Sequence, residues 1–192
     1  MKKILMLAMV LGLLVSICFA GEPAPDGFKK AKFGMTISQA RDEGILAEKD
    51  GTKFDGCIMF RGKGEMIGEV GVLVNYWFYD KSCKRNEGTY MDCQDKVRLG
   101  HITASIFGHR DVGIIKSGLV NKYGNPTKSE KLFNRMGHNI GMEYVWVFGL
   151  TGIKLTINEL KPSCTLRYEY YPLMKVLLDQ EKEGGSKAEK DL

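Results

Sequence analysis

The chain has 192 residues, of which 44% are hydrophobic and 27% are charged, and 28 basic against 23 acidic residues give a formal net charge of +5. This small excess is spread along the sequence and forms no basic run interleaved with aromatic residues. The composition therefore does not support nucleic-acid binding, and it is sufficient for one globular domain of ordinary size.

Residues 1–20 have the pattern of a secretory signal peptide. Lys2 and Lys3 form a positive start, an apolar run follows, and small residues precede a cleavage position before Gly21. One alternative is a transmembrane anchor, for which the run is short. Another is a lipoprotein anchored at Cys18, for which the residue before the cysteine is too bulky. We therefore expect a periplasmic or secreted protein whose net charge falls to +3 (26 basic against 23 acidic residues), with no later segment that spans a membrane.

Export would place the four remaining cysteines, Cys57, Cys83, Cys93 and Cys164, in an oxidising compartment, which favours disulfides. Four cysteines allow three pairings. Cys83 and Cys93 bracket a polar segment, so a bridge between them would close a loop and contribute about 3 kcal/mol. Cys57 would then pair with Cys164. The alternative is a zinc site, but the paired CxxC spacings of such sites are absent, and we expect neither a metal nor a cofactor.

The first half of the mature chain is predicted to contain one short helix and several strands. Residues 21–32 are rich in Pro and Gly and are expected to form a flexible leader. Thr36 is placed to cap a helix that ends at Gly44, and a turn is expected at residues 62–65. Alternation of apolar and polar residues predicts strands at residues 57–61, 70–79 and 97–107. Strand 70–79 is apolar on both faces, which is typical of a central strand: one face carries Val70, Val72, Val74, Tyr76 and Phe78, and the other carries Leu73, Trp77 and Tyr79.

The second half is predicted around an amphipathic helix at residues 111–123. Its apolar residues recur at the helical period, Asp111 is placed to cap the first turn, and Gly124 is placed to end the helix. Another helix is expected from residue 173, and the charged residues 183–192 are expected to be a disordered tail. A brief pairing is expected at residues 131–134, and further strands are predicted at residues 142–148, 153–159 and 164–170.

Together these elements predict one α+β domain at residues 33–182, with a mostly antiparallel sheet and one or two packed helices. A helix followed by strands occurs twice, at about residues 33–108 and 109–182. This order is compatible with a degenerate tandem of two α-plus-β-meander halves, although no residue-by-residue identity relates them.

Two segments resemble those of known exported proteins. FGMTISQA, at residues 33–40, resembles the helix start of small exported bacterial α+β proteins, including the SmpA/OmlA outer-membrane assembly lipoproteins. KYGNP, at residues 122–126, followed by Trp146, is similar to a segment of many uncharacterised exported proteins. Both segments are structural, so the resemblance implies the fold and carries over no site residue.

The sequence contains no recognisable catalytic constellation, because Gly-x-Ser-x-Gly is absent and the three histidines follow no metal-binding spacing. Trp77, Tyr79 and Tyr171 are candidate interface residues if one face of the sheet is uncovered, and core residues otherwise. We therefore expect a non-enzymatic envelope protein that binds or assembles with another protein. The alternative is a small exported hydrolase, which would require a cleft holding His101 or His109 beside a carboxylate.

Overall fold

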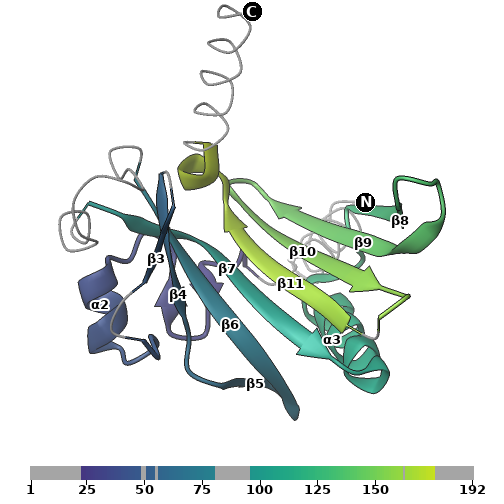
Figure 1. Ribbon diagram of the computed structural model, residues 1–192, viewed down its shortest axis with the longest axis horizontal. Helices are drawn as coiled ribbons and strands as arrows, with labels where there is room; N and C mark the ends of the chain where they lie inside the picture. Colours follow the sequence, from purple (N-terminus) through teal and green to yellow (C-terminus); the bar gives the residue numbers. More distant parts are fainter. Residues whose placement is uncertain (1–22, 49–50, 55, 81–95, 162, 176–192) are drawn as a thin grey trace, which may run out of the picture.

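The computed structural model describes residues 23–48, 51–54, 56–80, 96–161 and 163–175. In these residues it contains two helices, one further helical turn at residues 171–175, a two-stranded hairpin and a nine-stranded antiparallel sheet (Figure 1). The elements in chain order are β1 (Gly27–Phe28), β2 (Ala31–Lys32), α2 (Ile37–Asp42), β3 (Thr52–Phe54), β4 (Cys57–Arg61), β5 (Glu65–Ile67), β6 (Val70–Tyr79), β7 (Arg98–Phe107), α3 (His109–Tyr123), β8 (Lys128–Phe133), β9 (Asn139–Phe148), β10 (Thr151–Asn158) and β11 (Ser163–Tyr170).

The strand order of the large sheet is β3-β4-β6-β7-β11-β10-β9-β8, and β5 pairs with the remaining part of β6. The chain runs from one edge to the centre, where it forms β7, and then returns from the other edge to the centre, where it forms β11. These two strands pair antiparallel and lie side by side in the middle of the sheet (Figure 1). The first and second halves of the chain therefore share one sheet.

One face of this sheet carries the hydrophobic core. Alternate residues of β6, from Val70 to Phe78, are buried, as the two-residue period of a strand requires. They belong to the same cluster as Ile37 of α2, Ile115 of α3 and Phe28 of β1. Both helices and the small hairpin therefore pack on this face. We refer to the opposite side of the sheet as the open face.

The helix predicted after Thr36 is confirmed. Thr36 Oγ1 accepts a hydrogen bond from the Gln39 amide at 3.1 Å, and the Gln39 side chain accepts one from the Thr36 amide at 2.9 Å. This reciprocal pair is a capping box, which satisfies two amides that the first turn leaves without helical partners. Gly44 follows the helix with a positive φ of 68°, a conformation that glycine adopts at little cost.

The central helix is also confirmed, although its first residue was predicted wrongly. α3 begins at His109 with Gly108 as its N-cap residue, and no side chain caps it. Asp111 lies instead in the first turn, where a carboxylate interacts favourably with the helix dipole. At the other end, Gly124 has a φ of 77°, and its carbonyl accepts a hydrogen bond from the Trp146 indole at 2.9 Å. The helix end is thereby attached to β9.

The expectation of a flexible leader is wrong for residues 27–32, which form the hairpin of β1 and β2. Phe28 and Ala31 are buried, and the Phe28 ring lies 5.5 Å from the ring of Tyr168. Lys29 forms an ion pair with Glu65 of β5 at 2.6 Å. These contacts bind the segment to the core face even though its composition is typical of a loop.

The turn expected at residues 62–65 is a bulge instead. β4 and β5 both pair with β6, and between them the Gly62 amide donates a hydrogen bond to the Val74 carbonyl at 2.7 Å. The true turn lies at Gly68, whose φ is 60°. Glycine tolerates both the bulge and the turn, so sequence pattern alone did not distinguish them. The other predicted strands are confirmed with small shifts in their ends, and β3 and the first residues of β8 and β9 were not predicted.

The predicted α+β class with a mostly antiparallel sheet is confirmed. Residues 171–175 form a helical turn, close to the last predicted helix, whereas the predicted tail at 183–192 lies outside the described residues. Within the described part of the chain, no helix is both long and apolar enough to cross a bilayer.

Candidate functional site

The open face has an aromatic side and a charged side. His101 of β7 lies opposite Trp77 on β6 and opposite Glu169 on β11. One step along the strands, Arg167 of β11 lies opposite Lys154 of β10. Side chains that share a face and lie on neighbouring strands interact directly. On this face the aromatic side chains Trp77 and His101 lie on β6 and β7, and the charged side chains lie on β11 and β10.

An aromatic cluster, formed by Phe54, Trp77, Tyr79 and His101, covers the first side. The Phe54 and Trp77 rings have centroids 5.5 Å apart, and the Trp77 and His101 rings are stacked at 5.9 Å. The hydroxyl of Tyr79 lies 3.2 Å from His101 Nδ1, and that of Thr103 lies 2.9 Å from His101 Nε2. Both ring nitrogens of His101 therefore have hydrogen-bond partners.

The surroundings of His101 favour its neutral form. Burial lowers its pKa from 6.5 to about 4, and the positive charge of Arg167 adds to the effect. The imidazole is therefore neutral at pH 7, with one nitrogen that donates and one that accepts. A histidine that acts as a general base needs a pKa near the working pH and a nitrogen that can reach the substrate. Both ring nitrogens of His101 already have hydroxyl partners and its pKa is lowered, so the geometry favours a role in packing and orientation.

Tyr79 is a packing residue, which corrects its prediction as an interface residue. It is only 3% exposed, and burial raises the pKa of its hydroxyl. A Cβ placed on Gly100 would lie 2.8 Å from Leu173 Cβ and 2.9 Å from Tyr79 Cδ2, so both side chains fill the space above that glycine. The helical turn that contains Leu173 and the Tyr79 ring therefore lie beside the same glycine of β7.

The other two candidate interface residues, Trp77 and Tyr171, are partly exposed and lie in different places. Trp77 belongs to the aromatic cluster. Its indole nitrogen is the one buried side-chain nitrogen or oxygen in the described residues that has no hydrogen-bond partner. Tyr171 lies over β10, because a Cβ on Gly152 would be 2.1 Å from the Tyr171 hydroxyl. The structure therefore brings Trp77 and Tyr79 together around His101 and keeps Tyr171 apart from them.

An apolar patch, formed by Met66, Leu73 and Phe107, lies at the opposite end of the open face from Tyr79. Met66 pairs with Gly71 on β6, and Leu73 lies opposite Ser105 on β7. Phe107 follows Ser105 by two residues and so lies on the same face of β7. The three side chains are 51%, 63% and 63% exposed, respectively. All three side chains therefore project from the same end of the open face.

The sequence prediction did not single out this patch as an interface. Leu73 was placed on the second face of its strand, and Phe107 at the end of the next strand, but the bulge that brings β5 and Met66 beside them was missed. One sequence signal for such a patch is an apolar residue on the solvent-facing side of a strand, where the neighbouring residues on that side are polar or glycine. It identifies Leu73 and Phe107 once the strand register is known.

The predicted bridge between Cys57 and Cys164 is not formed. Both side chains are buried and no disulfide joins them. Cys57 lies at the start of β4 and Cys164 near the start of β11, and β6 and β7 separate these two strands in the sheet. A disulfide requires Cα atoms within about 7 Å, which two intervening strands exclude. Cys83 and Cys93 lie outside the described residues.

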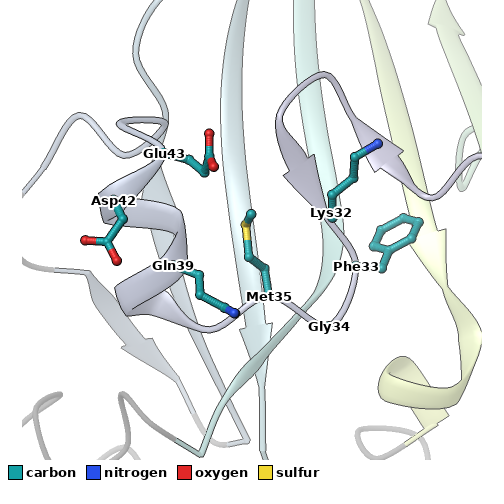
Figure 2. A pocket seen from close by; sticks show the side chains of 7 residues that line it. All are labelled: Lys32, Phe33, Gly34, Met35, Gln39, Asp42 and Glu43. Atoms are coloured by element: carbon teal, nitrogen blue, oxygen red, sulfur yellow. The ribbon is translucent and has the colours of Figure 1, made fainter.

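A depression next to α2 has structural residues in its wall (Figure 2). Its volume is about 510 Å³, and it is lined by Lys32, Phe33, Gly34, Met35, Gln39, Asp42 and Glu43. Gln39 belongs to the capping box, and Lys32 pairs with Asp26 at 2.7 Å. The Gly34 amide donates to the Leu99 carbonyl at 2.8 Å. These contacts attach the segment to β7, and we assign no chemistry to it.

In the residues that the structure describes, no group of three or more His, Cys, Asp or Glu side chains is placed to hold a metal ion. The side chain of His109 lies outside the described part of the chain. Comparison with known proteins found no matching family model, no similar curated protein and no similar solved structure. The geometry of the open face is therefore the basis for any functional conclusion.

Proposed function

We propose that this protein is exported and binds another envelope protein through the open face of its sheet, without catalysing a reaction. The apolar patch carries this proposal. Soluble monomers expose single apolar side chains routinely, but several of them gathered at one end of a fixed surface commonly mark a site of protein contact. The sheet fixes the backbone under Met66, Leu73 and Phe107, so a partner would meet a surface that needs little ordering.

The export part of the proposal rests on residues 1–20, whose pattern is that of a signal peptide. Mass spectrometry of protein recovered from the producing cell should find a mature chain that begins at Gly21. A chain that begins at a lipid-modified Cys18 would indicate the lipoprotein alternative. An uncut leader would contradict export.

The hydrolase alternative is weaker because His101 does not have the features of a catalytic base. Its neighbour across the strands is the carboxylate residue Glu169, but its ring nitrogens are paired with the hydroxyls of Tyr79 and Thr103. A substrate would have to break one of these hydrogen bonds to reach the ring.

Affinity capture from an envelope extract tests the binding proposal. The wild-type protein should retain a specific partner, and the double variant Leu73→Ser with Phe107→Ser should lose it. Phe133→Ser with Met136→Ser is the matched control, because these exposed residues lie near the other edge of the sheet. All proteins should have nearly the same melting temperature, since exposed substitutions usually change stability by less than about 0.5 kcal/mol.

Retention of the same partner by the patch variant would contradict the proposed site. Recovery of no partner, together with turnover of an envelope substrate, would favour the hydrolase. The capture is repeated with reductant, which tests whether a disulfide contributes to binding.

We also propose that the two halves of the domain, residues 33–108 and 109–182, form a degenerate tandem of two α-plus-β-meander units. In support, each half has a helix before its strands, α2 in the first half and α3 in the second. The last strands of the halves, β7 and β11, pair antiparallel at the centre of the sheet. This arrangement is compatible with an approximate two-fold axis between them.

A further inference from the structure

A cavity of about 770 Å³ lies on the charged side of the open face, where the helical turn at residues 171–175 meets β10 and β11. Its volume is in the range of small-molecule sites, roughly 300–1,000 Å³. Its lining includes Leu150, Lys154, Arg167, Glu169, Tyr171, Met174 and Lys175.

Backbone contacts hold the apolar wall of this cavity in place. The Tyr171 amide donates a hydrogen bond to the Leu150 carbonyl at 3.0 Å, and the Tyr171 ring extends over Gly152, where any larger side chain would displace it. Leu150 is 61% exposed. The wall formed by Leu150, Tyr171 and Met174 is therefore an apolar surface that remains accessible from solvent.

Three cations line this cavity: Lys154, Arg167 and Lys175. Lys154 and Arg167 are directly opposite each other on β10 and β11, an arrangement that is unfavourable for like charges unless an anion lies between them. Lys154 is partly neutralised by Glu143, which is 3.4 Å away. Arg167 is exposed, and no carboxylate in the described part of the chain lies within ion-pair distance of its guanidinium. Arg167 is therefore available to an anionic ligand.

Glu169 limits the charge of such a ligand. It lies two residues from Arg167 on the same face of β11, lines the cavity and is only 7% exposed. A second negative charge deep in the cavity would meet this carboxylate and would be repelled. A ligand with one anionic group, directed toward Arg167, avoids that repulsion.

We propose that this cavity binds an apolar monocarboxylate. Its carboxylate would accept hydrogen bonds from Arg167 and Lys154, and its hydrocarbon part would pack on Leu150, Tyr171 and Met174. Arginine suits the charged part because its planar guanidinium can bind a carboxylate through two parallel hydrogen bonds. The site lies apart from the apolar patch and does not depend on the proposed protein partner.

Calorimetric titration of the purified full chain tests the proposal, with decanoate as the probe. Three matched compounds isolate the features of the ligand: butanoate lacks the long chain, decyltrimethylammonium reverses the charge, and decanedioate adds a second carboxylate. We expect decanoate to bind at least about tenfold more tightly than each of them, a difference of about 1.4 kcal/mol. Acetyl-leucyl-leucine carries the same single carboxylate at the end of a peptide. If it binds more tightly than decanoate, the natural ligand is a peptide C-terminus; if decanoate binds more tightly, the natural ligand is a fatty acid.

Two variants locate the site. Arg167→Gln should weaken decanoate binding about tenfold, and Leu150→Ser should weaken it as well, whereas Lys161→Gln, an exposed cation in the turn between β10 and β11, should leave it unchanged. The side chains are exposed, so the melting temperatures should agree. Absence of decanoate binding, equal binding of decyltrimethylammonium, or an Arg167→Gln variant that binds within twofold of the wild type would overturn the proposal.

Discussion

His101 is a histidine whose surroundings favour the neutral ring. In the folded protein, burial and Arg167 lower its pKa to about 4, whereas the unfolded chain would have the ordinary value of 6.5. Two hydroxyls, from Tyr79 and Thr103, fix the ring in position. Protonation would place a charge in the aromatic cluster and convert both nitrogens into donors. The residue is therefore a source of acid sensitivity.

The free energy of unfolding should decrease as the pH is lowered from about 6.5 to about 4. In that window the unfolded chain binds a proton at position 101 and the folded chain does not, so acid favours the unfolded state. The lowered pKa corresponds to at most about 3 kcal/mol, and the loss should be complete below the folded pKa. Urea titrations at a series of pH values measure this dependence.

The control is His101→Gln, which keeps a polar side chain that does not titrate. The variant should be less stable at pH 7 and should have a weaker pH dependence between 6.5 and 4. The difference between the two proteins separates the histidine from carboxylates that titrate in the same range. Parallel pH profiles would show that His101 is not responsible.

Cys164 should not react with thiol reagents in the native protein. It is buried on the core side of β11, and burial, with a contribution from Asp111, raises its pKa to about 11. Because the thiolate is the reactive form, both access and ionisation are suppressed. Mass spectrometry after alkylation should find Cys164 modified only when denaturant is present. Rapid labelling without denaturant would contradict the observed burial.

At the scale of the residue, the sequence predicted which face of a strand a side chain occupies better than it predicted which distant residues the side chain contacts. The alternation in β6 correctly separated Val70, Val74 and Phe78 from Trp77 and Tyr79. It could not show that Leu173, far along the chain, lies beside the same glycine as Tyr79. It also could not place Glu169 beside His101, because strand register between distant segments depends on the whole sheet.

At the scale of the element, the helix start at Thr36 depends on side chains that are close in sequence. Thr36→Ala removes the hydroxyl that caps the Gln39 amide, and we expect a loss of about 1 kcal/mol. For a chain of this size that corresponds to a decrease in melting temperature of roughly 2–4 °C. Thr36→Ser keeps the hydroxyl and is the control, and it should change the melting temperature by much less.

Two glycines should respond in opposite ways to alanine. A Cβ on Gly141 in β9 would lie 1.9 Å from the Ile157 carbonyl oxygen, so Gly141→Ala should destabilise the sheet by roughly 2 kcal/mol or more. Gly113 is an exposed residue of α3 with open space around its Cα, so Gly113→Ala should stabilise the protein by about 0.5–1 kcal/mol. Thermal unfolding measures both. Equal effects of the two substitutions would show that backbone crowding at Gly141 is not important.

Local signals were sufficient for α2, α3 and most strands, because caps, stops and periodicity are properties of neighbouring residues. They failed where long-range contacts decided the outcome. Residues 27–32 have the composition of a loop, but Phe28 packs on Tyr168 and Lys29 pairs with Glu65, so the segment is held as a hairpin. Neither partner can be identified from the segment itself.

At the scale of the molecule, the pairing of β7 with β11 joins the two halves. The sequence predicted both strands but not that they would be neighbours, since strand order depends on pairings between segments about 60 residues apart. The core is correspondingly continuous: one cluster contains Phe60 and Phe78 from the first half and Trp146 and Leu155 from the second. Destabilising either half should therefore destabilise the other.

The two tryptophans allow a direct measurement of this coupling, because Trp77 lies in the first half and Trp146 in the second. Trp146→Phe removes the hydrogen bond to the Gly124 carbonyl and part of a fully buried side chain, so we expect a loss of roughly 2 kcal/mol. In this variant Trp77 fluorescence reports on the half that was not changed. If the halves unfold together, the urea midpoint from Trp77 fluorescence should decrease and should coincide with the midpoint from circular dichroism. A Trp77 midpoint that stays at the wild-type value, with circular dichroism showing two transitions, would mean that the halves fold independently and that the β7–β11 pairing contributes little to cooperativity.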